Sequence, residues 1–121
     1  MIKEICAAGL DSKTLRNCLR VARTVRAITP DGMAEETAIA TQDGGMVLEF
    51  TVGPREVAFA ISANPTCFFV ARHKDDFRKA GMILEETGIT GLARWLVDAA
   101  SFPTEGLIIG GPSSRGRNTA A

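Results

Sequence analysis

The chain has 121 residues, of which 45% are hydrophobic and 23% are charged, and its formal net charge is zero. These values are typical of one globular domain, and they exclude a disordered chain and a strong general attraction to nucleic acid or acidic lipid. We expect a single domain over residues 1–109. Residues 110–121 lack large apolar side chains, so we expect them to form a flexible tail.

The first third of the chain is predicted to be helical. A short helical turn over residues 2–8 ends at Gly9, and Asp11 or Ser12 can cap a second helix that runs to about Ile28. Pro30, Asp31 and Gly32 then stop the helix. Its apolar stripe has spacings of three and four residues and consists of Leu15, Cys18, Leu19, Ala22 and Val25.

A basic stripe occupies the opposite side of this helix, and no acidic residue lies between residues 13 and 26. Like charges at helical spacing repel each other by a few tenths of a kcal/mol per pair, so an acidic partner would relieve them. That partner is a protein, a nucleic acid or the chain's own Glu35 and Glu36. The alternative is a solvated face whose long stems cover apolar surface. The candidate binding residues are Lys13, Arg16, Arg20, Arg23 and Arg26.

The charges are divided unevenly along the chain. Residues 1–30 carry six basic and two acidic side chains, whereas residues 31–60 carry one basic and six acidic ones. This division suits a charged partner or self-association, and the alternative is two solvated faces of one domain.

Residues 41–72 have the pattern of consecutive antiparallel strands, preceded by a short strand over residues 37–41. The sequence Asp43-Gly44-Gly45 has the turn chemistry of a hairpin. Apolar residues then alternate with others over residues 46–52 and 57–61, so one side of this meander needs a cover. We expect a register with three apolar cross-strand pairs on that side: Val52 with Val57, Phe50 with Phe59, and Leu48 with Ile61.

Two further strands and a helix complete the prediction. The strand over residues 66–72 contains Phe68 and Phe69, one on each side of the sheet, so we expect the second side to be partly covered as well. A weaker strand over residues 80–85 follows. The segment of Leu107, Ile108 and Ile109 is an added strand or part of a partner contact. The last helix has an apolar stripe of Leu92, Trp95, Leu96 and Ala99.

Segregated helices and strands joined by short turns predict an α+β fold. We expect an antiparallel meander of four to five strands, with an N-terminal and a C-terminal helix packed mainly on one face.

Cysteine usage and the absence of long apolar runs bear on the location of the protein. Cys6, Cys18 and Cys67 are odd in number and scattered, which is typical of reduced, buried thiols in a cytoplasm. No secretory leader pattern and no apolar run of about 20 residues are present, so we expect a cytoplasmic protein with no membrane contact.

The sequence offers little reaction chemistry. His73 precedes Asp75 and Asp76, but no nucleophile is signalled beside them, and a solvated turn is the stronger interpretation. Adjacent carboxylates point apart and rarely chelate alone. We therefore predict no catalytic residues, no metal site and no cofactor.

Residues 39–50, Ile-Ala-Thr-Gln-Asp-Gly-Gly-Met-Val-Leu-Glu-Phe, resemble a pattern in small uncharacterised bacterial proteins. In those proteins a helix precedes a hairpin with Asp-Gly-Gly, two or three apolar residues, Glu and an aromatic residue, and a sheet and a C-terminal segment follow. The likeness covers roughly residues 15–97, with Phe50 in place of the usual tryptophan. The resemblance implies no known activity and no catalytic residues.

The sequence therefore favours a small non-enzymatic binding or regulatory protein, of the kind mobile elements encode, that acts through a protein–protein interface. One alternative is a small-ligand binder or small enzyme with a pocket between sheet and helix. Another is a nucleic-acid-binding accessory that uses the basic helix. We also expect a homodimer, because an unpaired strand over residues 37–41 or 80–85 can pair with its symmetry mate.

Overall fold

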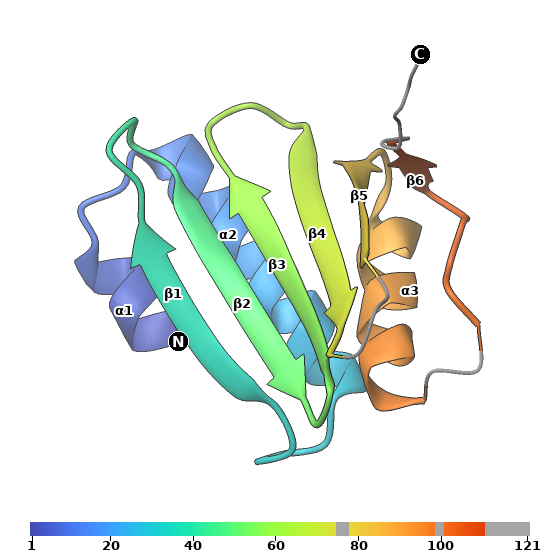
Figure 1. Ribbon diagram of the computed structural model, residues 1–121. Helices are drawn as coiled ribbons and strands as arrows, with labels where there is room; N and C mark the ends of the chain where they lie inside the picture. Colours follow the sequence, from blue (N-terminus) through green and yellow to red (C-terminus); the bar gives the residue numbers. More distant parts are fainter. Residues whose placement is uncertain (75–77, 99–100, 111–121) are drawn as a thin grey trace.

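The computed structural model describes residues 1–74, 78–98 and 101–110. One antiparallel sheet, with its strands in sequence order, forms the first layer of the fold (Figure 1). The strands are β1 (Glu35–Ala40), β2 (Met46–Val52), β3 (Arg55–Ile61), β4 (Cys67–His73), β5 (Arg78–Ile83) and β6 (Leu107–Ile109). The six strands of the described residues confirm the predicted α+β meander and correct its expected count of four to five.

Within the described ranges, three helices form the second layer, and Figure 1 shows them behind the sheet, on one face. They are α1 (Ile2–Ala7), α2 (Ser12–Ile28) and α3 (Glu86–Val97). Helix α2 packs against α1, α3 and the central strands, while α3 also contacts β2, β3 and β5. The other face of the sheet has no helix over it in the part of the chain that the structure describes.

Helix α2 begins where the sequence predicts, because the carboxylate of Asp11 accepts a hydrogen bond from the backbone N–H of Thr14 at 2.9 Å. At its other end the hydroxyl of Thr29 donates to the carbonyl of Val25 at 3.0 Å. Cys18 and Val21 lie on the inner side of the helix and are fully buried. This packing fixes the direction in which the basic stripe points.

The register between β2 and β3 differs from the prediction by two residues. Phe50 lies opposite Val57, and Leu48 lies opposite Phe59. The turn is shorter than expected, with only Gly53 and Pro54 between the strands. Gly53 has φ 57°, and type II′ turns place glycine at this first central position. Because the offset is even, the six apolar side chains of the predicted pairs still face the helices.

The core lies between the sheet and the helices. The Phe50 and Phe59 rings are fully buried and meet edge to face with centroids 5.8 Å apart. Trp95 is 7% exposed and contacts Phe102 with a centroid distance of 5.3 Å. Phe50, Phe59 and Trp95 therefore belong to one core.

The edges of the sheet differ from those expected. β6 pairs with β5, so β5 is an interior strand and Leu107–Ile109 forms the edge. The opposite edge, β1, begins with Glu35 and Glu36, whereas the sequence interpretation placed an uncharged strand at residues 37–41. Charges on an edge strand oppose pairing with another edge. A dimer built by strand pairing at β1 is thus disfavoured.

The helix-free face corrects a second expectation. Phe69 is buried under the helices, but Phe68 on the other side of β4 is 52% exposed. The sequence predicted that this side would be partly covered. Within the described residues, no helix lies over the Phe68 ring, and about half of this residue stays exposed.

Two sequence predictions concern residues outside these helices and strands. Gly110 still belongs to the folded part, because its N–H donates to the carbonyl of Ala80 at 2.7 Å. Residues 111–121 of the predicted tail, and Ala99 of the final helical stripe, lie outside the described residues. Among the helices of the described ranges, none combines the length and the apolar character that a bilayer crossing requires.

The three cysteines are free thiols in two different environments. Cys18 and Cys67 are buried, but Cys6 is exposed, which corrects the expectation that all three are buried. Burial raises the pKa of the Cys18 thiol to about 11 and that of Cys67 to about 12. Because only the thiolate reacts, these two thiols are protected at neutral pH.

We therefore expect a disulfide reagent at pH 8 to titrate one thiol per chain in the native protein and three per chain after denaturation without reductant. The thiol that reacts in the native protein is Cys6. In Cys6→Ser no thiol should react before denaturation, and two per chain should react after it. Rapid reaction of two or more thiols in the native protein would contradict the burial of Cys18 and Cys67.

Candidate functional site

The basic stripe of α2 lies on the outer side of the helical layer, away from the sheet. Its first and fourth members are ten residues apart, so the stripe is about 15 Å long. All of its side chains are exposed. Within residues 1–74, 78–98 and 101–110, no carboxylate forms an ion pair with four of them: Lys13, Arg16, Arg20 and Arg23.

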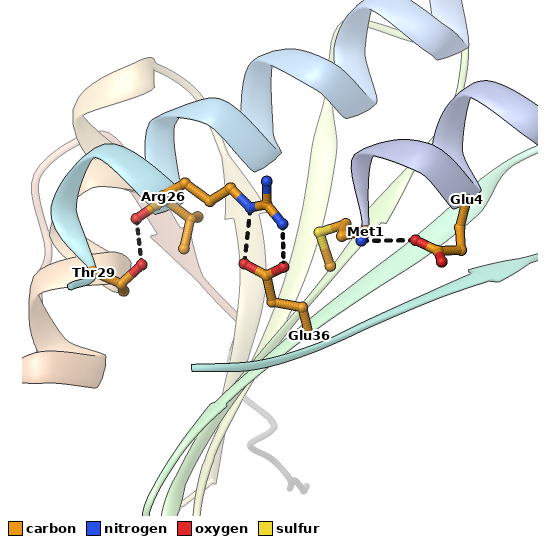
Figure 2. A network of polar contacts seen from close by, with 6 residues as sticks. Met1, Glu4, Arg26, Thr29 and Glu36 are labelled. Carbon is orange, nitrogen blue, oxygen red and sulfur yellow. Dashed lines mark hydrogen bonds and ion pairs between the residues drawn. The ribbon is translucent and has the colours of Figure 1, made fainter. Parts of the chain in front are cut away.

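The fifth predicted member, Arg26, has a partner within the chain. Its guanidinium donates to both oxygens of the Glu36 carboxylate, at 2.6 and 3.0 Å (Figure 2). One of the alternatives read from the sequence, the chain's own Glu35 and Glu36 region, is thus confirmed for this residue. The hydrogen bonds from Arg26 lower the pKa of Glu36, and those to Glu36 raise the pKa of Arg26. Arg26 therefore joins α2 to β1 and is not available to a partner in the way the other four are.

Replacing Glu36 by glutamine is expected to lower the free energy of unfolding at pH 7 by about 0.5–1 kcal/mol, since the pair is only partly shielded from water. The folded-state pKa of Glu36 lies below the ordinary value of 4.5. Its contribution is therefore present above pH 4.5 and is lost as the pH falls through the lowered pKa.

Urea unfolding at pH 7 and at pH 3 measures this difference between the wild type and Glu36→Gln. The gap should shrink at the lower pH. Glu35→Gln is the matched control, because Glu35 is exposed and forms no ion pair with a described residue. A gap that is as large at pH 3 as at pH 7 would show that the charge on Glu36 is not responsible.

The hollows of the surface show no assembled reaction centre. One hollow of the described surface, of about 450 Å³, is lined in part by Glu56, Arg72 and His73. Arg72 donates to Glu56 at 2.6 Å, so this pair is already satisfied. Asp75 and Asp76, which the sequence places beside His73, lie outside the described residues. No group of three or more His, Cys, Asp or Glu side chains in the described part could hold a metal ion.

A second surface, which sequence reasoning missed, is the helix-free face of the sheet. Strand pairing places one apolar side chain from every strand in a single row across this face. Three of them are about half exposed. The signal in the sequence was the pair Phe68 and Phe69, which requires one ring on each side of the sheet, but we expected another part of the chain to cover the second side. We call these residues the open-face row: Ile39, Val47, Ala60, Phe68, Met82 and Ile108.

Fold and surfaces together define a two-layer α+β protein with one exposed basic helix and one exposed sheet face. Comparisons with known protein families, with curated proteins and with solved structures found no match for this chain.

Proposed function

We propose that the protein is a small non-enzymatic binding protein that contacts an acidic protein partner through four cations of α2. The observation that carries this proposal is that Lys13, Arg16, Arg20 and Arg23 share one exposed helix face without an ion-pair partner in the described chain. Such a row of like charges is unfavourable in the free protein. Carboxylates placed along it would turn that repulsion into attraction.

The charge of the whole molecule favours a protein over nucleic acid. Domains that bind nucleic acid are typically strongly basic, with a pI above about 9. This chain has a pI near 6.6 and a formal net charge of zero. Long-range attraction to a phosphate backbone is therefore weak, while the local field of four cations suffices for a matching acidic surface.

The stripe also has the dimensions of a helix contact. Residues three and four apart on an acidic helix recur at the spacing of the stripe, so a partner helix of about three turns could oppose all four cations. Arginine suits such a contact because its planar guanidinium can bind a carboxylate through two parallel hydrogen bonds.

The test compares the wild type with Arg16→Gln/Arg20→Gln/Arg23→Gln. The defined probes are a helical peptide with glutamates at spacings of three and four, and a 20-base-pair DNA duplex. A pull-down from the native host with mass spectrometry supplies natural partners for the same comparison. We expect the triple variant to bind the peptide and the natural partner at least tenfold more weakly at about 0.1 M salt.

The matched control is Lys3→Gln/Lys74→Gln/Arg94→Gln, which removes three exposed cations outside the stripe. It should bind the peptide nearly as the wild type does. A folded triple variant of the stripe that keeps every partner would reduce the stripe to solvated surface. Salt-sensitive binding of the duplex, with no binding of the peptide, would replace the protein partner by nucleic acid.

A further inference from the structure

The open-face row holds three of the five exposed large apolar side chains of the described surface. Among the large apolar side chains with high exposure, three lie in this row: Ile39 at 47%, Phe68 at 52% and Ile108 at 47%. They come from the first, fourth and last strands, so the exposure extends across the whole sheet (Figure 1). Contiguous exposed apolar surface of this kind marks an interaction site.

Charged residues on the same face are sorted by sign. The half formed by β1, β2 and β3 carries Glu35, Glu49 and Glu56, which share a face with the open-face row because they are separated from it by even numbers of residues. The half formed by β4 and β5 carries Arg72 and Arg78. One half of the face is therefore acidic and the other half is basic.

The basic half is not satisfied within the described part of one copy. Arg72 and Arg78 lie directly opposite each other on adjacent strands, and like charges in this position are destabilising. Arg72 has an ion pair with Glu56. For Arg78 no ion pair is formed with another residue of the described chain, nor is one formed by Glu49 on the acidic half. Each half thus presents a charge that the other half of a second copy could meet.

We propose that the open face binds a second copy of this chain, sheet against sheet, about a two-fold axis parallel to the strands and midway between β3 and β4. Such a rotation places β3 over the partner's β4, β2 over the partner's β5, and β1 over the partner's β6. The acidic half of each copy then covers the basic half of the other. An axis perpendicular to the strands would place each strand over itself and would oppose like charges.

The sizes of the apolar side chains agree with the same axis. It brings Ala60 opposite the partner's Phe68, so the largest side chain of the row meets the smallest one. Val47 lies opposite the partner's Met82, and Ile39 lies opposite the partner's Ile108. Alternation of large and small residues across facing positions is what lets two sheets pack about 10 Å apart.

The expected contact is modest in area. Six strands spaced by about 4.8 Å, each contributing about six residues at about 3.4 Å, give a footprint of roughly 600 Å² per copy. The total is close to the lower bound of about 1,000 Å² for a specific interface. The dimer should therefore be weak and dissociate on dilution.

Sedimentation velocity on the full chain, from about 1 to 500 µM, tests this proposal. We expect a monomer at the low end and a dimer at the high end, with weaker association at 0.5 M salt than at 0.05 M. Phe68→Asp should weaken the dimer at least tenfold, because it places a charge in the apolar row. Met33→Asp is the matched control, since Met33 is 45% exposed but lies in the turn before β1.

A charge exchange tests the orientation. Glu49→Arg and Arg78→Glu should each weaken the dimer several-fold, and the double variant should recover most of the loss, because the charges on β2 and on the partner's β5 would again be opposite in sign. Melting at 1 µM controls for changes within one copy. A wild type that stays monomeric at 500 µM, a dimer that Phe68→Asp leaves unchanged, or a dimer that strengthens with salt would overturn the proposal. The first outcome leaves the open face to a different protein and does not affect the role of the basic stripe.

Discussion

Replacing Phe59 by alanine is expected to lower the free energy of unfolding by about 3–5 kcal/mol. The ring is fully buried between the sheet and the helices and meets Phe50 edge to face. Its removal leaves a cavity that the paired central strands cannot close. Because domains of this size are stable by only about 5–15 kcal/mol, the variant would lose a large part of its free energy of unfolding.

Urea unfolding at 1 µM measures this effect, and Phe68→Ala is the matched control. Phe68 is the same residue type one strand away but is 52% exposed, so its truncation should cost under about 1 kcal/mol. Equal losses at the two positions would contradict the assignment of one covered and one open face.

The second large effect is expected at Gly81 in β5. A Cβ built at this position would lie 2.0 Å from the carbonyl oxygen of Ile108 and 2.9 Å from the Cα of Ile109. These are backbone atoms of the paired strand, so they cannot move aside as a flexible side chain could. We expect Gly81→Ala to cost about 2–3 kcal/mol and to release β6 from the sheet.

Hydrogen exchange locates this change. In Gly81→Ala the backbone amides of β6 and the N–H of Gly110 should lose protection, whereas those of β2 and β3 should keep theirs. Gly110→Ala is the control, because its Cβ would lie 3.3 Å from the Ala80 carbonyl and needs only a small adjustment. Unchanged protection of β6 in Gly81→Ala would show that the strand is not held as described.

The alternation of apolar residues was enough to predict which side chains face the helices, because the faces of a strand repeat every two residues. It was not enough to predict which residues pair. Registers that differ by two residues bury the same set, and only the length of the turn at Gly53 and Pro54 separates them. The conformation of Gly53 decides that length, and a positive φ is not specified by the amino-acid type alone.

The sequence left two interpretations of the segment that forms the edge strand β6: an added strand or part of a partner contact. Three residues are too few for a periodicity to be recognised. A usable signal was Gly81, since an isolated glycine within a strand often marks a close backbone approach. The structure confirms that approach at Ile108.

One of the two candidate surfaces could be predicted from the sequence, and the other could not. The basic stripe could be predicted because the spacing of residues on a helix follows from the sequence. The structure changed one part of that prediction, because Arg26 forms an ion pair within the chain. The open face could not be predicted, because Phe68 showed only that an apolar ring faces outward. Whether another part of the chain, a second copy or solvent covers such a ring depends on the tertiary and quaternary structure.

We propose that two separate surfaces on opposite sides of the fold bind different partners. Two NMR titrations on the full chain test it most directly: dilution from 500 to 1 µM, and addition of the glutamate peptide at 1 µM protein. Dilution should shift the methyl signals of Ile39, Val47 and Ile108 on the open face. The peptide should shift the amides around Arg16, Arg20 and Arg23 and leave the open face unchanged. If both titrations shift the same residues, or if dilution shifts only α2, the claim of two independent surfaces is wrong.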